Sequence, residues 1–153
     1  MASRSTSKIW EYLGNLEKDK LSHALRSLAD TEQELANLEA SVVKMQEMKN
    51  EYLTKLNQAD SGQDIAIVEL TTSINFIGRI EEALRHSAAR RLELNKHLRQ
   101  AKQHCADRQV DVKKYAILGE KELKASVLKD RQEEQKQADQ HATMSWLQRQ
   151  SHS

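Results

Sequence analysis

The chain has 153 residues and a formal net charge of +1 at pH 7, with charged side chains making up 31% of it. Aromatic residues make up only 4%, so few large groups are available to fill a compact globular core. The near-zero net charge gives no reason to expect the molecule as a whole to bind nucleic acid. Proline is absent and glycine occurs four times, which predicts an all-α chain with few helix breaks.

Cysteine usage and the lack of long apolar stretches bear on where in the cell the protein is expected. The single cysteine, Cys105, excludes an internal disulfide and fits a reducing environment. Residues 1–7 lack the apolar core of a signal peptide, and no run of apolar residues is long enough to span a membrane. We therefore expect a cytoplasmic protein with no membrane span of its own.

A heptad pattern predicts a first helix over residues 7–57. Apolar residues recur at two core positions, which are interrupted by the polar Thr31 and Lys49. Upstream apolar residues keep helical spacing but leave this register, which predicts a stutter near residues 17–21. The predicted core residues are Leu21, Ala24, Leu28, Leu35, Leu38, Val42, Met45, Tyr52 and Leu56, and the upstream ones are Ile9, Leu13 and Leu16.

The next segment, residues 58–62, is the predicted turn. Gly62 is the only glycine in a polar cluster, and Ser61 followed by Asp64 resembles a helix capping box. Two helices joined by a short turn pack antiparallel. The predicted fold is a single domain, a long antiparallel two-helix coiled-coil hairpin whose second helix is the longer. A structural coiled coil, in which two opened chains pair in parallel as a homodimer, is the alternative.

A second helix is predicted over residues 63–140, followed by a frayed tail at 141–153. A turn near residue 59 pairs residue i with about 118 minus i, so about 40 residues overhang the first helix. The predicted core of this helix is Ile67, Leu70, Ile74, Ile77, Leu84, Ala88, Leu98, Cys105, Val112 and Ala116, with polar Arg91, Asn95, Lys102 and Gln109. The overhanging apolar residues without a partner are Tyr115, Ile117, Leu118, Leu123, Val127, Leu128, Trp146 and Leu147.

An apolar strip on the second helix is wider than a two-helix core requires. Phe76, Ile80 and Ala83 follow helical spacing beside the predicted core residues Ile74 and Ile77. These side chains either cover the edge of the core or form a face on which a partner docks.

A basic segment lies between residues 85 and 104, where six cations accompany a single acid, Glu93. Such a segment is either a solvated helix surface or a contact for an acidic protein or anionic lipid headgroups. Nucleic acid is less favoured, because no aromatic side chains are interleaved to stack on bases. The six cations are Arg85, Arg90, Arg91, Lys96, Arg99 and Lys102.

Motifs for catalysis are lacking. No glycine-rich phosphate-binding loop with its lysine is found. His97 lies about two helical turns from His104 and Cys105, and no second motif completes a metal site. We expect a protein that is not an enzyme and that binds no metal or cofactor.

The string NEYLTKLNQADSGQDIAIVELTTSINFIGRIEEALR resembles the centre of the flagellar FliJ proteins. In that family an EY pair and a short polar turn precede a helix with a Phe-Ile and an acidic-Ala pattern. The similarity runs from the heptads near Leu21 to the segment 130–140. Stalk proteins of type III injectisomes are similar in shape, so an injectisome homologue is a second alternative.

The resemblance implies a non-catalytic component of the flagellar type III export apparatus, located in the cytoplasm and peripherally at the inner membrane at the flagellar basal body. It implies a stalk that enters a hexameric export ATPase, escorts export chaperones and contacts the cytoplasmic domain of the membrane export gate. The gate contact carries over onto Phe76, Ile80, Ala83 and Ser87, the last standing where the family pattern has histidine. The ATPase contact is expected at Asp130, Arg131, Gln135, Lys136 and Asp139.

Overall fold

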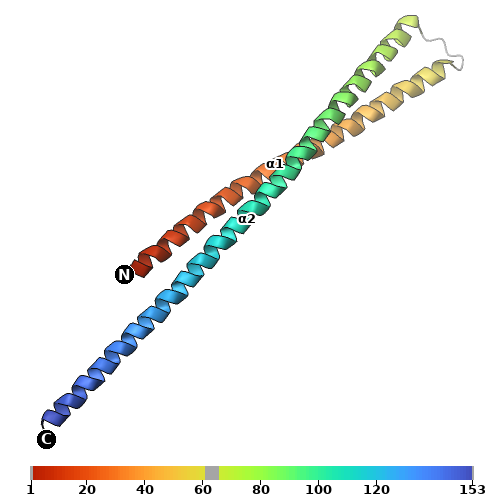
Figure 1. Cartoon of the computed structure of the whole chain (residues 1–153). Coiled ribbons are helices and arrows are strands. Elements are labelled where there is room, and N and C mark those ends of the chain that lie inside the picture. The colour runs from red at the N-terminus through yellow and green to blue at the C-terminus, as the bar shows by residue number, and fades with distance from the viewer. Residues whose placement is uncertain (1, 61–65, 153) are drawn as a thin grey trace. The chain divides into compact units, whose positions relative to one another are not determined.

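The computed structural model describes the backbone of residues 2–60 and 66–152, and the side chains of residues 8–58 and 66–152. It contains two helices, α1 (Ala2–Asp60) and α2 (Ile67–Ser151), and no strand occurs in these ranges (Figure 1). The predicted all-α fold with a longer second helix is confirmed. Both helices run past the ends predicted at residues 57 and 140, and α2 is helical through the segment predicted to fray.

The start of α2 differs from the predicted one. The predicted capping box of Ser61 and Asp64, together with Gly62, lies outside the described residues. In the described part of the chain the Leu70 amide donates a 3.1 Å hydrogen bond to the carbonyl of Ala66, directly before the first helical residue. Alanine offers no side-chain oxygen to the free amides of the first turn, so this helix start lacks a side-chain cap at that position.

The chain divides into two units, which we call the central unit (His23–Cys105) and the terminal unit (Met1–Ser22 with Ala106–Ser153). In each unit a segment of α1 packs against a segment of α2. Contacts in the central unit join Tyr52 to Phe76 and, further back along α1, Glu34 to Arg90. Because α2 numbers rise as α1 numbers fall, the helices are antiparallel within one chain, unlike the parallel homodimer.

The predicted core of α1 is confirmed. Every predicted position from Leu21 to Leu56 is buried or half-buried, and Ala24 is only 6% exposed. The two polar positions, Thr31 and Lys49, are also half-buried. Heptad spacing of apolar side chains on this helix therefore identifies the face that meets α2.

The stutter predicted near residues 17–21 is wrong. Upstream of Leu21 the same heptad continues through Glu17, Gly14 and Trp10, which are buried or half-buried. Of the three residues that the stutter would have placed in the core, Ile9 is 53% and Leu16 is 39% exposed, and Leu13 is half-buried. The heptad was missed here because its core positions hold a carboxylate, a glycine and a tryptophan in place of aliphatic side chains.

On α2 one of the two predicted heptad positions faces the core, except at Arg91, which is exposed. The other does not, except at Asn95, which is half-buried. Leu70, Ile77, Leu84, Leu98, Cys105 and Val112 are buried or half-buried as predicted. By contrast, Ile67 is 80% and Ile74 is 54% exposed, and Ala88, Lys102, Gln109 and Ala116 are exposed as well. The second core position instead holds Ile80 and Leu94, exposed by 5% and 2%. Its other members, which are half-buried, are Ser73, Ser87, Ala101, Arg108 and Tyr115.

The two helices also pair with a different offset from the predicted one. The numbers of the paired residues Tyr52 and Phe76 add to 128, whereas the predicted pairing gives about 118. In the terminal unit the ring of Trp10 lies 5.9 Å from that of Tyr115. Tyr115 therefore has a partner on α1, contrary to the prediction.

Two glycines in the terminal unit face the aromatic residues of the opposite helix. A Cβ atom at Gly119 would lie 3.5 Å from Trp10 Cβ, and one at Gly14 would lie 3.9 Å from Tyr115 Cβ. Each bulky ring thus sits beside a position that carries no side chain. Both distances are ordinary van der Waals contacts, so alanine would fit at either position, and a mid-helix glycine costs about 1 kcal/mol relative to alanine.

A carboxylate occupies the core of the same unit. The Glu17 side chain is 11% exposed, and its two oxygens meet different cations: Oε1 lies 3.2 Å from Lys20 Nζ and Oε2 lies 3.5 Å from Arg108. A buried charge is tolerated only when it is paired, so this layer favours the register that brings Arg108 opposite Glu17.

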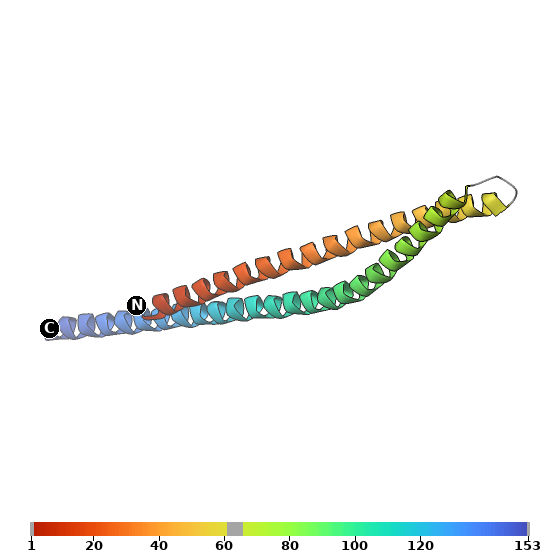
Figure 2. The same ribbon diagram turned by 90° about the horizontal axis from the view of Figure 1, so that it is seen from above.

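The C-terminal part of α2 extends past the N-terminal end of α1 (Figures 1 and 2). Residues 127–144 of α2 are all exposed. Six of the apolar residues predicted to lack a partner are at least 43% exposed: Ile117, Leu123, Val127, Leu128, Trp146 and Leu147. We call residues 127–151 the C-terminal extension.

Candidate interaction surfaces

Only part of the strip predicted as the gate contact lies beside the core. Ile80 belongs to the core of the central unit, and Ser87, at the same heptad position, is half-buried. Ile74, which was predicted to be core, is exposed instead. The prediction that the strip lies off the core is therefore wrong for Ile80, because the second core position was placed one residue too far along α2.

Phe76 and Ala83 remain at the edge of the core, where both are half-buried. The Phe76 ring packs at 4.7 Å, centroid to centroid, on the ring of Tyr52. Met48, one helical turn before Tyr52 on α1, is 38% exposed. Both helices therefore supply apolar side chains near Phe76, and the α1 residues were missed because the predicted offset paired Phe76 with an earlier part of α1.

Two of the six cations in the basic segment are neutralised within the central unit. Arg90 bonds Glu34 on α1 and also lies 3.0 Å from Glu93 on α2. The hydrogen bond from Arg90 lowers the pKa of Glu93, and the bond to Glu34, followed by that to Glu93, raises the pKa of Arg90. Arg91 lies 3.6 Å from Glu39. These pairs help to join the two helices.

The other four cations of the segment, Arg85, Lys96, Arg99 and Lys102, are exposed. No ion pair among the described side chains involves them. The structure therefore separates the segment into cations that bind α1 and cations that face solvent.

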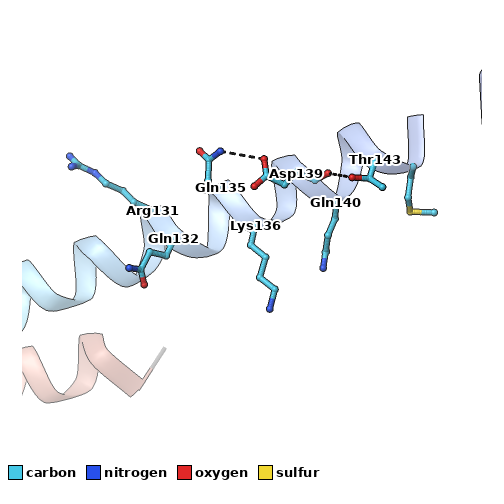
Figure 3. A pocket seen from close by; sticks show the side chains of 8 residues that line it. Arg131, Gln132, Gln135, Lys136, Asp139, Gln140 and Thr143 are labelled. Atoms are coloured by element: carbon cyan, nitrogen blue, oxygen red, sulfur yellow. Dashed lines mark hydrogen bonds between the residues drawn. The ribbon is translucent and has the colours of Figure 1, made fainter. Parts of the chain in front are cut away.

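The residues predicted to contact the ATPase lie on the C-terminal extension, and all of them are exposed. Figure 3 shows four of them, Arg131, Gln135, Lys136 and Asp139, projecting from successive turns of α2. Gln135 donates a 3.3 Å hydrogen bond to Asp139. The hollow on this surface is lined by residues of α2 alone, between Arg131 and Met144. With no opposing wall from another described element, this surface suits a macromolecular partner better than a small ligand.

The described residues include no metal site and no membrane-spanning helix. No group of three histidine, cysteine or acidic side chains among them is placed to hold a metal ion. Cys105 is 5% exposed and lies in the core of the central unit. Neither helix, in its described part, combines the length and apolar character that crossing a membrane requires.

Comparison with known families settles what the geometry leaves open. The sequence pattern that defines the flagellar FliJ protein family matches residues 11–151, nearly the whole chain. The chain belongs to the FliJ family. Searches among curated proteins and among solved structures gave no match.

Membership of the FliJ family identifies the chain as a component of the flagellar protein export apparatus, in which FliJ proteins act without catalysing a reaction. The antiparallel two-helix arrangement is consistent with the coiled coil expected for this role. The family match also favours the flagellar system over the injectisome alternative.

Proposed function

We propose that the protein is a non-catalytic stalk that binds the hexameric flagellar export ATPase through the C-terminal extension. The observation that carries this proposal is that α2 continues beyond the N-terminal end of α1 with its side chains exposed (Figure 2). Exposed apolar side chains that gather in one segment, as Met144, Trp146 and Leu147 do, are typical of a surface on which a partner binds. A ring pore that surrounds the extension would cover them.

The mechanism that we propose is mechanical. A helix whose side chains differ around its circumference presents different surfaces to the subunits of a ring. If these surfaces bind associated subunits better than separate ones, the stalk favours hexamer formation by that difference in affinity. The predicted contact residues Asp130, Arg131, Gln135, Lys136 and Asp139 offer charges of both signs for such contacts.

We further propose that the protein contacts the cytoplasmic domain of the export gate through the edge of the central unit. Phe76 and Ala83 are accessible there, and Tyr52 supports Phe76 from α1. Ile80 and Ser87 act from within the core, by holding this edge in place. The protein would also escort export chaperones, and it would reside in the cytoplasm, peripherally at the inner membrane at the flagellar basal body.

The ATPase contact is tested by adding the purified chain to the purified export ATPase and measuring turnover and hexamer formation. We expect both to rise with the wild-type chain. The double variant Arg131→Glu/Lys136→Glu should lose most of this effect while keeping its helical circular dichroism. Arg26→Glu/Lys44→Glu is the matched control, because it makes the same charge change at exposed positions of α1. Equal activity of the two double variants would contradict the assignment to the extension.

The gate contact is tested separately, by calorimetric titration of the gate's cytoplasmic domain. Ala83→Glu places a charge at the proposed edge and should weaken binding at least about tenfold. Ala36→Glu, at an exposed position of α1, is the control. Thermal unfolding of both variants reports whether the fold persists. Unchanged binding of Ala83→Glu would contradict the proposal.

A further inference from the structure

The outward face of α2 in the central unit carries an exposed leucine among unpaired cations. Leu92 is 73% exposed, more than any other leucine among the described exposed hydrophobic residues. Arg85 and Arg99 lie seven residues before and after it, and therefore on the same face of the helix. We call this surface the basic platform and define it as Arg85, Ala88, Ala89, Leu92, Lys96 and Arg99, all of which are exposed.

The positive charge of the basic platform is not balanced by its neighbours. Two of the acids nearest in sequence form ion pairs elsewhere: Glu81 lies 3.3 Å from Lys49 on α1, and Glu93 lies 3.0 Å from Arg90. The third, Glu82, lies 3.8 Å from His86, which makes an ion pair only when that histidine is protonated. None of the three platform cations forms an ion pair with a described residue. An anionic partner would therefore not have to displace an internal acid.

The shape of the platform suits a helix lying along α2. Ala88 and Ala89 precede Leu92 by one turn, and their small side chains allow another helix to approach closely. Arg85 and Arg99 are about 21 Å apart along the helix axis, at about 1.5 Å per residue. A second helix lying alongside can place a carboxylate near each of them and an apolar side chain near Leu92.

Other anionic partners fit less well. A helix that binds a membrane surface presents a broad apolar face, whereas the platform has only one large apolar side chain, Leu92. Single-stranded nucleic acid is commonly bound by stacking of bases on aromatic side chains, and residues 85–102 contain none. Charge complementarity and the alanine pair together favour a protein helix.

We propose that the basic platform is a docking surface for an acidic amphipathic helix of a partner protein. The partner's apolar residue packs on Ala88, Ala89 and Leu92, and its carboxylates pair with the cations at either end. No platform residue belongs to the surfaces assigned above to the ATPase or the gate. The proposal is therefore independent of those assignments.

The test uses the full chain and a labelled 21-residue helical peptide that carries leucines on one stripe, with glutamates flanking the stripe at seven-residue intervals. A second peptide has lysine in place of every glutamate. Fluorescence anisotropy should show saturable binding of the acidic peptide, and binding of the lysine peptide at least about tenfold weaker. Binding of the acidic peptide should weaken as the salt concentration rises, because salt screens the attraction between the charges.

Three variants locate the binding site. Arg85→Glu/Arg99→Glu should weaken binding of the acidic peptide at least about tenfold, and Leu92→Ala about three- to tenfold. Arg26→Glu/Lys44→Glu, with the same change of charge on exposed positions of α1, should stay within about twofold of the wild type. Circular dichroism verifies that each variant is folded, and these surface changes should leave the unfolding midpoint nearly unchanged.

Several results would overturn the proposal. Absence of acidic-peptide binding at low salt would do so, as would an equal loss in the platform and control double variants. If Leu92→Ala did not weaken binding, the contact would be purely electrostatic, and the proposal that a helix packs on this surface would be wrong. Tighter binding to vesicles of phosphatidylglycerol and phosphatidylcholine, or to a single-stranded oligonucleotide, would show that the surface serves another class of partner.

Discussion

The central unit and the C-terminal extension have similar helical backbones but differ in what covers their side chains. In the central unit Leu94 is 2% exposed and Ile80 is 5% exposed, whereas Leu128 of the extension is 58% exposed. Helix formation requires only local propensity and hydrogen bonding along one chain, so a helix can continue where no core exists. The comparison shows that helicity in this protein does not by itself indicate a packing partner.

The largest expected difference between the two regions is the cost of removing a leucine side chain. Leu94→Ala should lower the free energy of unfolding by about 3 kcal/mol, since it leaves a cavity in the central unit. Leu128→Ala in the extension should change it by less than about 0.5 kcal/mol. Urea unfolding followed by circular dichroism measures both. Similar losses for the two variants would mean that the extension is packed in solution.

A second pair of variants tests the register of α2 within the central unit. Ile80→Ala should cost about 2 kcal/mol, whereas Ile74→Ala, at a 54% exposed position, should cost less than about 0.5 kcal/mol. The two changes remove the same atoms, so the difference reports burial alone. A larger loss for Ile74→Ala than for Ile80→Ala would mean that α2 packs in the register expected from the sequence.

Substitutions at the buried Glu17 and its partner Arg108 should have an intermediate effect on the free energy of unfolding. Arg108→Met should cost about 1–2 kcal/mol, because Glu17 stays buried but keeps Lys20 at 3.2 Å. Glu17→Leu combined with Arg108→Leu should recover most of this loss, since no unpaired charge remains. Chemical unfolding of the single and double variants tests this. A double variant less stable than Arg108→Met would indicate that the pair contributes more than charge balance.

The smallest expected effect is a pH dependence at the surface of the central unit. The hydrogen bond from Arg90 lowers the pKa of Glu93, so the ionised carboxylate favours the folded state. This contribution is fully present above the carboxylate's ordinary pKa of 4.5, and it is lost as the pH falls through the lowered value. The wild type should therefore be slightly more stable than Glu93→Gln at pH 7 but not at pH 3.

The control for this measurement is Glu47→Gln, which removes an exposed carboxylate that takes part in none of the ion pairs described above. Its stability relative to the wild type should change little between the two pH values. A Glu93→Gln difference that persists at pH 3 would mean that the side chain acts through packing rather than charge.

The interaction surfaces could be predicted only in part. Sequence resemblance pointed to Phe76 and Ala83, which do reach the edge of the core, and also to Ile80, which does not. The basic segment was visible as a run of cations, but its division depended on which acids of α1 lie opposite. Arg90 faces Glu34, whereas Arg99 faces solvent, and no local pattern distinguishes the two.

The helices, the core positions of α1 and the family could all be predicted from the order of the amino acids. Helical propensity is local, and on α1 a single stripe of apolar side chains has the heptad spacing that marks a core. On α2 apolar residues occupy neighbouring stripes, such as Ile74, Ile77 and Ile80, so more than one face could have been buried. Which face is buried follows from the packing of α2 on α1. The choice depends on how the two helices align: the aligned register buries Ile80, packs Trp10 beside Gly119 and brings Arg108 to the buried Glu17.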